Sequence, residues 1–336
     1  MFTLSLISIF IISFISIYLL IRYAEKLGLV DIPNERSMHK KVTPRGAGIA
    51  FVLPVFLVVL FFDLENFKTY YYIYLAIAIV FMAGAWDDIK NISPKSKFLF
   101  IFVASVLLYV NDFAIYSLGT YLGYEVILPA WFVFPFTFFA IAGYTNALNL
   151  MDGLDGLAAS LSLVMFVTFL TIGLEYSDPL LISLSSFFTV TLLAFLFFNW
   201  NPAKIFMGDS GSLALGMVIS ILAIQAMQYI TPISALFIIA MPILDTFIVI
   251  TRRIQRGNSP FKADKNHMHH FLFNVKADVR YTVIVLVLMQ IVFSIIGYQL
   301  NPSNEFLSLI LFMILFYLYF NLFDQRLKRR KSHDWD

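Results

Sequence analysis

Residues 131–174 read WFVFPFTFFAIAGYTNALNLMDGLDGLAASLSLVMFVTFLTIGL, two long apolar segments joined by a polar stretch. The apolar segments, 131–149 and 156–174, each have about the 20 residues that a transmembrane helix needs. Packing does not explain the two Asn, two Asp and two Gly of the stretch 146–156, where the segments meet. The stretch therefore predicts a pair of membrane-spanning helices joined by a functional polar turn.

The composition of the whole chain extends this interpretation. The 336 residues are 60% hydrophobic and only 13% charged, whereas soluble domains carry roughly 25% charged residues. A soluble globular protein is excluded, and so are disordered, collagenous and disulfide-stapled proteins. The absence of Cys excludes a thiolate nucleophile and a Cys metal site. The expected fold class is all-α, a polytopic integral membrane protein.

Apolar segments along the chain predict about eleven transmembrane helices in one membrane-embedded domain, residues 1–336. The predicted segments are 3–22, 47–62, 69–86, 98–111, 131–149, 156–174, 180–199, 211–228, 232–251, 281–299 and 304–323. The first segment lacks the basic region and the cleavage site of a signal peptide, so we treat it as a helix. The loop 112–130 either lies flat on the membrane or forms a small hairpin.

The distribution of positive charges predicts the orientation of the chain in the membrane. If eleven segments alternate, 22 of the 23 Lys and Arg residues fall on one side, and only Lys68 falls on the other. Cytoplasmic loops carry the excess of Lys and Arg. The N-terminus is therefore expected outside and the C-terminus in the cytoplasm. The cluster KRRK (328–331) is expected to contact anionic lipid head groups.

Polar segments gather on the predicted cytoplasmic side. Asp87 and Asp88 end one predicted helix, and two adjacent carboxylates at a membrane boundary favour a cation between them. Asn146, Asn149 and Asp152 share a helical face at spacings of three residues. The predicted active-site loops are 23–46, 87–97, 150–156, 200–210 and 252–280.

The stretch NWNPAKIFMGDSGSLALG (199–216) leads into an apolar helix. Asp209 or Ser210 is the expected N-cap of that helix. The backbone N–H groups near Gly208 and Gly211 could then receive a phosphate.

The loop RRIQRGNSPFKADKNHMHHF (252–271) holds three histidines, His267, His269 and His270, among five cations. It has no HExxH spacing and no Cys, so phosphate binding is favoured over zinc binding. The alternative is a basic loop held against lipid head groups. Asp245 stands inside a predicted helix, where a charge is costly, and Arg252 or Arg253 is its expected partner, in a structural or a catalytic role.

These residues together predict a chemistry. The carboxylates and amides are hard oxygen ligands, and Mg²⁺ binds one or two carboxylates together with substrate phosphates. The basic loops suit a polyanionic substrate. We therefore expect phosphoryl-type transfer between a soluble phosphorylated donor and a lipid. A transporter or flippase of a phosphorylated substrate is the competing class, but it would place binding groups near the midplane in paired repeats.

Five motifs carry a resemblance to a known family over nearly the whole chain: GLVDIPNERSMHKKVTPRGAG (28–48), AWDD (85–88), NALNLMDGLDGLA (146–158), FMGDSGS (206–212) and SPFKADKNHMHH (259–270). The sequence resembles the polyprenyl-phosphate N-acetylhexosamine-1-phosphate transferases. The resemblance implies transfer of a hexosamine-1-phosphate, most simply that of N-acetylglucosamine (GlcNAc), from a UDP-sugar to undecaprenyl phosphate, with release of UMP. UDP-N-acetylfucosamine and UDP-N-acetylquinovosamine are the alternative donors.

The resemblance also implies roles for individual residues. Asp209 and Asn149 match positions that hold Mg²⁺ (or Mn²⁺ as its substitute) against the diphosphate. Asp87 and Asp88 match the acidic pair near the acceptor phosphate. In this interpretation Asp87, Asp88 and Asp209 are the catalytic candidates, and Lys97 matches a phosphate-contacting lysine.

The remaining candidates bind substrate in this interpretation. Asp155 matches a uracil-contacting position, Asp152 is its neighbour, and Asn146 lies on the same helix face as Asn149. The histidine motif matches residues that contact the sugar diphosphate. The first cytoplasmic loop contributes further candidates: Arg36, His39 and Arg45.

The resemblance implies a bacterial inner-membrane enzyme with its active site on the cytoplasmic face. Such an enzyme starts a cell-surface polysaccharide of the O-antigen, common-antigen or teichoic-acid type. Its partners are the UDP-sugar and the lipid, with no nucleic acid, and the resemblance is compatible with a homodimer.

Overall fold

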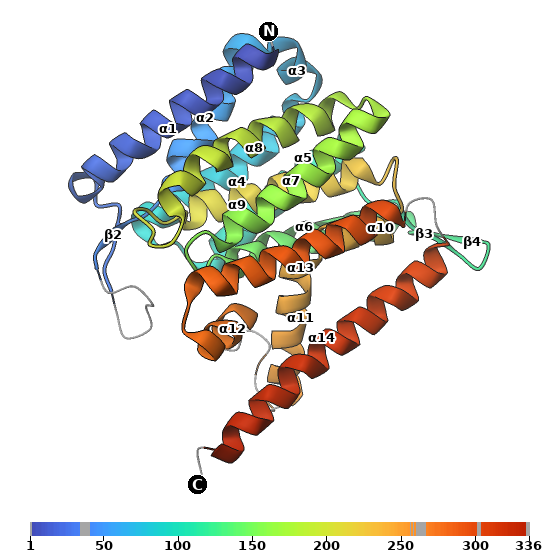
Figure 1. Ribbon diagram of the computed structural model, residues 1–336. Coiled ribbons are helices and arrows are strands. Elements are labelled where there is room, and N and C mark those ends of the chain that lie inside the picture. Colours follow the sequence, from blue (N-terminus) through green and yellow to red (C-terminus); the bar gives the residue numbers. More distant parts are fainter. Residues whose placement is uncertain are drawn as a thin grey trace.

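The computed structural model describes residues 2–33, 41–255, 257, 259, 267–300 and 304–333, with side chains as far as residue 321. These residues form an all-α bundle with two short β-ladders (Figure 1). The helices are α1 (Phe2–Leu27), α2 (Ala47–Phe62), α3 (Leu64–Thr69), α4 (Tyr71–Lys90), α5 (Pro94–Tyr109), α6 (Ala130–Met151), α7 (Leu157–Tyr176), α8 (Pro179–Asn199), α9 (Gly208–Ala226), α10 (Pro232–Ile238), α11 (Ala240–Gln255), α12 (Met268–Lys276), α13 (Val279–Gln299) and α14 (Glu305–His333).

The strands form two antiparallel pairs. β1 (Val30–Asp31) pairs with β2 (Thr43–Pro44), and β3 (Ser117–Tyr121) pairs with β4 (Tyr124–Ile127). The second pair is a hairpin in the loop 112–130, as one of the two sequence interpretations expected. Figure 1 shows β2 and α12 toward one end of the bundle and the hairpin at the other.

Each predicted apolar segment coincides with helix, so the all-α polytopic class is confirmed. Seven of the described helices are long and apolar enough to cross a membrane, or eight if α10 and α11 count as one. α2 and α5, with 16 residues each, are about 24 Å long, less than the roughly 30 Å of the hydrocarbon layer. The count of eleven crossings and the orientation of the termini stay predictions.

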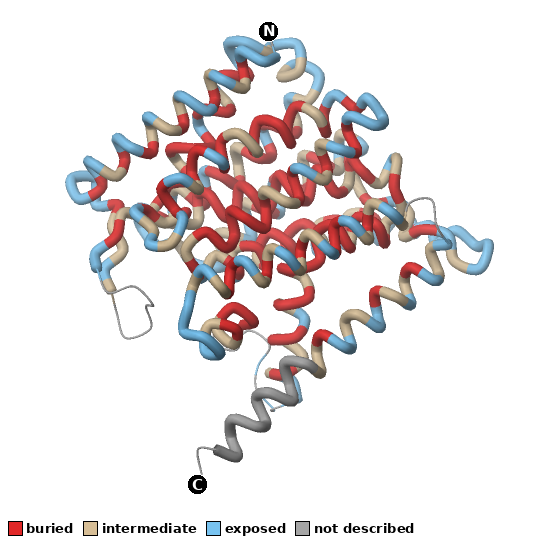
Figure 2. Tube along the Cα trace, viewed as in Figure 1, coloured by how far each residue is buried: buried red, intermediate tan, exposed pale blue. Residues whose placement is uncertain are grey.

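α9 lies at the centre of the bundle, and α2, α4, α6, α7 and α8 all pack against it. Figure 2 shows this centre as the main buried region. A helix that is apolar on every side belongs in such a position. Small residues allow the close packing: a Cβ on Gly216 would lie 2.7 Å from Cα of Thr145 on α6. The core therefore fixes the beginning of α9 relative to the helices around it.

The predicted segment 232–251 is not one helix, and this corrects the sequence analysis. α10 and α11 meet at Ile239 at an angle of 85°. Pro242 lacks the N–H that would bond the carbonyl of Ile238 in a continuous helix. Nε2 of Gln290, on α13, donates to that carbonyl at 2.7 Å, and Oε1 of Gln290 accepts from the Met241 N–H at 3.3 Å. A buried side chain thus satisfies the broken backbone, as the membrane interior requires.

The predicted orientation can be tested by cysteine labelling, because the chain has no Cys of its own. Lys95→Cys, after α4, should react with a membrane-impermeant maleimide only in inverted vesicles. Ser177→Cys, after α7, should react only in intact cells, because the charge distribution places it outside. Each variant serves as the control for the other. Labelling of position 95 from outside would overturn the orientation.

Candidate active site

The candidate site forms around the first turn of α9, and a residue of α4 caps that turn. Oδ1 of Asp88 accepts from the Asp209 N–H at 2.9 Å. Oδ2 accepts from the Ser210 N–H at 3.0 Å and from the Ser210 hydroxyl at 2.5 Å. The expected N-caps, Asp209 and Ser210, are therefore wrong. The N–H groups of Asp209 and Ser210 are not open to a phosphate, because a carboxylate of the protein already holds them. Phosphate binding at the N–H groups of Gly208 and Gly211 stays a prediction.

Glycines bring three helices into backbone contact at this point. A Cβ on Gly48 of α2 would collide with the backbone of Gly211, and one on Gly84 of α4 would collide with the backbone of Asp209. Gly208 has a φ of 73°, and its Cβ would lie 2.6 Å from both carboxylate oxygens of Asp88. The position of Asp209 is therefore set by backbone packing.

Lys97, near the start of α5, joins two of the predicted catalytic carboxylates. Its Nζ lies 2.5 Å from Oδ2 of Asp209 and 3.0 Å from Oδ1 of Asp87. All three side chains are partly exposed, so they remain accessible to a ligand. The structure thus brings together residues that lie more than a hundred positions apart in the sequence.

The end of α6 contributes the next group. Nδ2 of Asn149 donates to the Ser212 hydroxyl at 2.8 Å, and Oδ1, the atom that a cation would use, takes no part in this bond. Asn146 lies one turn earlier and is partly buried. Burial, together with the negative charges of Asp209, Asp88 and Asp155, raises the pKa of Asp152 to about 8. The site therefore holds more negative charge than Lys97 balances.

Asp155 shapes the loop before α9. Its Oδ2 accepts from Nδ2 of Asn201 at 2.8 Å and from the Ala203 N–H at 3.0 Å. Beside it, Oδ1 of Asn199 accepts from the Gly156 N–H at 2.9 Å. These bonds tie the loop 152–156 to the loop 199–205. The predicted uracil contact of Asp155 stays a prediction.

The loop between α1 and α2 reaches the site through Arg45. Its Nη2 donates to the Asp88 carbonyl at 3.0 Å and to Oδ1 of Asn91 at 3.5 Å. Arg45 therefore closes the end of α4 that carries the acidic pair. Arg36 and His39, also predicted here, lie outside the described residues.

The histidine motif stands against the loop that follows α6. His267 precedes α12 as its N-cap, while His269 and His270 lie in its first turn. Nε2 of His269 lies 2.5 Å from where a Cβ of Gly153 would be, so a larger residue there would displace the His269 ring. The rings of His267 and His269 are nearly parallel, with centroids 5.7 Å apart.

Asp245 has a different partner from the one expected. Arg252 or Arg253 was the expected partner, but Oδ2 of Asp245 lies 2.6 Å from Nδ1 of His267. Its Oδ1 accepts from the Met268 N–H at 2.7 Å. The histidine motif and α11 are thus joined through one carboxylate.

A pH effect on stability follows from His269. Burial lowers its pKa to about 3 from an ordinary 6.5. Below pH 6.5 the unfolded chain binds a proton at this ring that the folded protein does not, so stability falls as the pH drops from 6.5 toward 3. The melting temperature should decline less between pH 7.5 and pH 5 in His269→Gln than in the wild type. Equal declines would contradict this assignment.

The donor set suits a magnesium ion. Among the described residues no group of three His, Asp or Glu side chains has metal-binding geometry. Mg²⁺ does not need one, because it binds one or two carboxylates and completes its shell with water and substrate phosphates. The Lys97 ammonium between Asp87 and Asp209 marks a place where a cation is stabilised. Asp209, Asn149 and Asp87 are the residues that would hold the ion.

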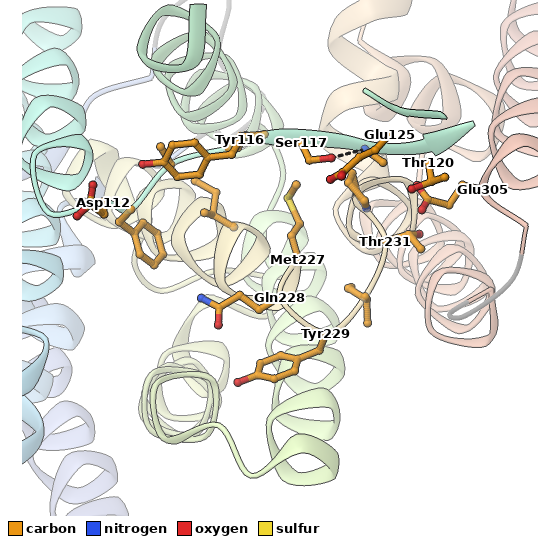
Figure 3. A pocket seen from close by; sticks show the side chains of 17 residues that line it. Asp112, Tyr116, Ser117, Thr120, Glu125, Met227, Gln228, Tyr229, Thr231 and Glu305 are labelled. Carbon is orange, nitrogen blue, oxygen red and sulfur yellow. Dashed lines mark hydrogen bonds between the residues drawn. The ribbon is translucent and has the colours of Figure 1, made fainter. Parts of the chain in front are cut away.

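A cavity of about 600 Å³ lies at the other end of the bundle (Figure 3). It opens between the β3–β4 hairpin and the end of α9, and Asp112, Glu125 and Glu305 are its acidic residues. None of the predicted site residues lines it. This cavity therefore contributes no residue to the candidate site.

Several residues of the site escaped the sequence analysis. Ser212, Asn91 and Asn201 take part through hydrogen bonds that cross between distant segments. Ser210 was expected only as a cap, whereas its hydroxyl donates to Asp88. Serine and asparagine are common in turns and caps, so their types carry little signal. The glycines of PRGAG and of the helix before Asp87 carried a signal, because glycine inside an apolar helix often marks close packing.

Comparisons with known proteins show what the chain is similar to. Residues 70–227 match the family described as glycosyl transferase family 4. A probable undecaprenyl-phosphate N-acetylglucosaminyl 1-phosphate transferase of Bacillus subtilis is 36% identical over 303 residues, covering 88% of this chain and 83% of that protein. Undecaprenyl-phosphate alpha-N-acetylglucosaminyl 1-phosphate transferases of Yersinia pestis and Escherichia coli are 33% and 30% identical, each over 94% of this chain and 89% of their own length.

Proposed function

We propose a function from the premise that the chain belongs to glycosyl transferase family 4, with the undecaprenyl-phosphate N-acetylglucosaminyl 1-phosphate transferases as its relatives. The chain transfers GlcNAc-1-phosphate from UDP-GlcNAc to undecaprenyl phosphate and releases UMP. The observation that carries this proposal is the cluster of Asp87, Lys97 and Asp209 at the end of a membrane bundle. Carboxylates and a cation at a lipid boundary suit the joining of a soluble diphosphate to a lipid phosphate.

The reaction is a single exchange of phosphoryl bonds. An oxygen of the lipid phosphate attacks the β-phosphorus of UDP-GlcNAc, and the bond from that phosphorus to the bridging oxygen of UMP breaks. The products are undecaprenyl diphosphate-GlcNAc and UMP. One diphosphate bond forms as another breaks, so positioning and charge stabilisation supply most of the catalysis.

The residues of the site divide this work. Asp87 accepts the proton of a monoanionic lipid phosphate or orients that phosphate for attack. Lys97 moves from its carboxylate partners to the phosphate oxygens, on which negative charge gathers. Asp209 and Asn149, with Asp87 beside them, would hold magnesium, and the bound ion would supply positive charge to the diphosphate. The histidines contact the sugar diphosphate from the other side of the loop 152–156.

The test of this function is transfer of label. Purified protein with undecaprenyl phosphate, Mg²⁺ and radiolabelled UDP-GlcNAc should form a butanol-extractable product that releases GlcNAc-1-phosphate on diphosphate cleavage. UDP-N-acetylfucosamine and UDP-N-acetylquinovosamine, run in parallel, decide the sugar. EDTA should stop the transfer, and Mg²⁺ should restore it. An absence of lipid product with every UDP-sugar would refute the function.

The reaction path gives a further prediction. Direct attack requires the lipid for any exchange of labelled UMP into UDP-GlcNAc. A double displacement through an aspartyl-phosphate at Asp87 would allow that exchange without lipid. Protein stripped of co-purified polyprenyl phosphate should therefore show no exchange until undecaprenyl phosphate is added. Exchange in the stripped protein that Asp87→Asn abolishes would establish the double displacement instead.

A further inference from the structure

Asp245 is a buried carboxylate outside the acidic cluster around Asp209. Its exposed fraction is 1%, and it lies in the second turn of α11, just beyond the break at Ile239. A charge in such a place is costly unless it is paired and hydrogen-bonded. Its two oxygens are used separately, one on Nδ1 of His267 and one on the Met268 N–H. The carboxylate therefore holds a histidine ring and the first N–H of α12 at once.

The bond to Nδ1 fixes more than the position of a ring. When Nδ1 of a histidine carries the proton and donates it to a carboxylate, Nε2 on the opposite side of the ring is set as the acceptor or second donor. The ring plane is set as well, and the His269 ring lies nearly parallel to it, at an angle of 12°. Asp245 thus controls the tautomer of His267 and the start of the helix that carries His269.

This arrangement leads back to the acidic site. His269 fits against Gly153, and the next residue toward α6 is Asp152, whose pKa is raised in part by the charge of Asp209. We infer that Asp245 is a positioning residue of the transfer reaction, which holds His267 and the first turn of α12 so that the histidines stand against the loop 152–155. This inference rests on the proposed function.

The chain offers a matched control in Asp178. It is also buried, accepts from the Leu181 N–H at 2.7 Å in the first turn of α8, and is bonded by Gln225 and Tyr229. It differs in lying toward the hairpin end of the bundle, away from the histidines. Asp178→Asn should therefore reproduce the loss of a buried carboxylate without touching the site.

The first experiment is a double-mutant cycle measured as kcat/KM for UDP-GlcNAc. Asp245→Asn should lower it about 10- to 100-fold, the usual range for a residue that orients a ligand-binding histidine. His267→Asn retains an N–H near Nδ1 but lacks Nε2. If Asp245 acts through His267, the double variant should be within about threefold of His267→Asn alone. Independent losses that multiply, or an equal loss in Asp178→Asn, would overturn the inference.

The second experiment does not depend on activity. Long-range ¹H–¹⁵N spectra of the ¹⁵N-histidine-labelled protein, assigned with His267→Asn, should show Nδ1 of His267 protonated in the wild type and in Asp178→Asn. Asp245→Asn should change the ring to the Nε2–H form that a free imidazole prefers. An unchanged His267 spectrum in Asp245→Asn would overturn the inference. If the wild type transfers no sugar, the proposed function fails, and this spectrum still decides the role of Asp245.

Discussion

Asp209→Asn is expected to lower turnover at least a hundredfold at saturating Mg²⁺ while the protein remains folded. The side chain lies where the diphosphate charge must be stabilised, and removing one such group typically costs 10²–10³-fold in rate. Folding should change little, because Asp209 is partly exposed and its ion pair is with a partly exposed lysine. Initial rates of lipid product formation and the melting temperature together measure both effects.

Asp112→Asn is the matched control for this substitution. Asp112 lies at the opposite end of the bundle, and its φ of 58° suits asparagine. This variant should retain wild-type turnover. Turnover of Asp209→Asn above a tenth of the wild-type value would exclude Asp209 from the metal site.

Asp88→Ala should reduce stability more than any other change in the acidic cluster, by about 2–4 kcal/mol in the free energy of unfolding. The substitution leaves two N–H groups and one hydroxyl at the start of α9 without their acceptor. Turnover should fall as well, because Asp209 sits in the turn that Asp88 caps. The melting temperature in detergent, without substrate, is the measurement.

Asp87→Ala separates the two members of the acidic pair. Asp87 pairs with Lys97 and is partly exposed, whereas Asp88 is 3% exposed. The Asp87 variant should therefore melt close to the wild type but lose turnover. If Asp88→Ala melted like Asp87→Ala, the cap would not contribute to stability. Of the two neighbouring carboxylates, Asp87 would then act on the substrate and Asp88 would stabilise the structure of the site.

The helices could be predicted from the sequence because hydropathy is a local property. The 19 mostly apolar residues of the segment 156–174 predict a spanning helix without knowledge of any neighbour. The break between α10 and α11 is different. Pro242 was visible, but proline is tolerated inside membrane helices when a neighbour satisfies the freed carbonyl. Only the structure shows that Gln290 does so and that the chain turns by 85°.

Some features of the candidate site could likewise be predicted from the sequence, and others could not. The residue types of Asp87, Lys97 and Asp209 pointed to phosphate chemistry, and the resemblance placed them together. The role of Asp88 as a cap could not be predicted, because it depends on a contact across 121 positions of sequence. The partner of Asp245 was misjudged for a related reason. Arg252 and Arg253 were neighbours on the same helix, while His267 reaches Asp245 only when the chain folds back as α12.

The hydrogen bonds from Gln290 to the break between α10 and α11 have a consequence for the order in which the helices fold during synthesis. Ile238 and Met241 precede Gln290 by 52 and 49 residues in the sequence, so they are translated first. Until α13 is inserted, the break exposes a carbonyl and an N–H that a lipid environment penalises. The bent form of α10 and α11, and with it the setting of α12, is therefore completed only after α13 is in place. A nascent chain arrested before residue 290 should form the acidic cluster, but its histidine motif should lack a fixed position.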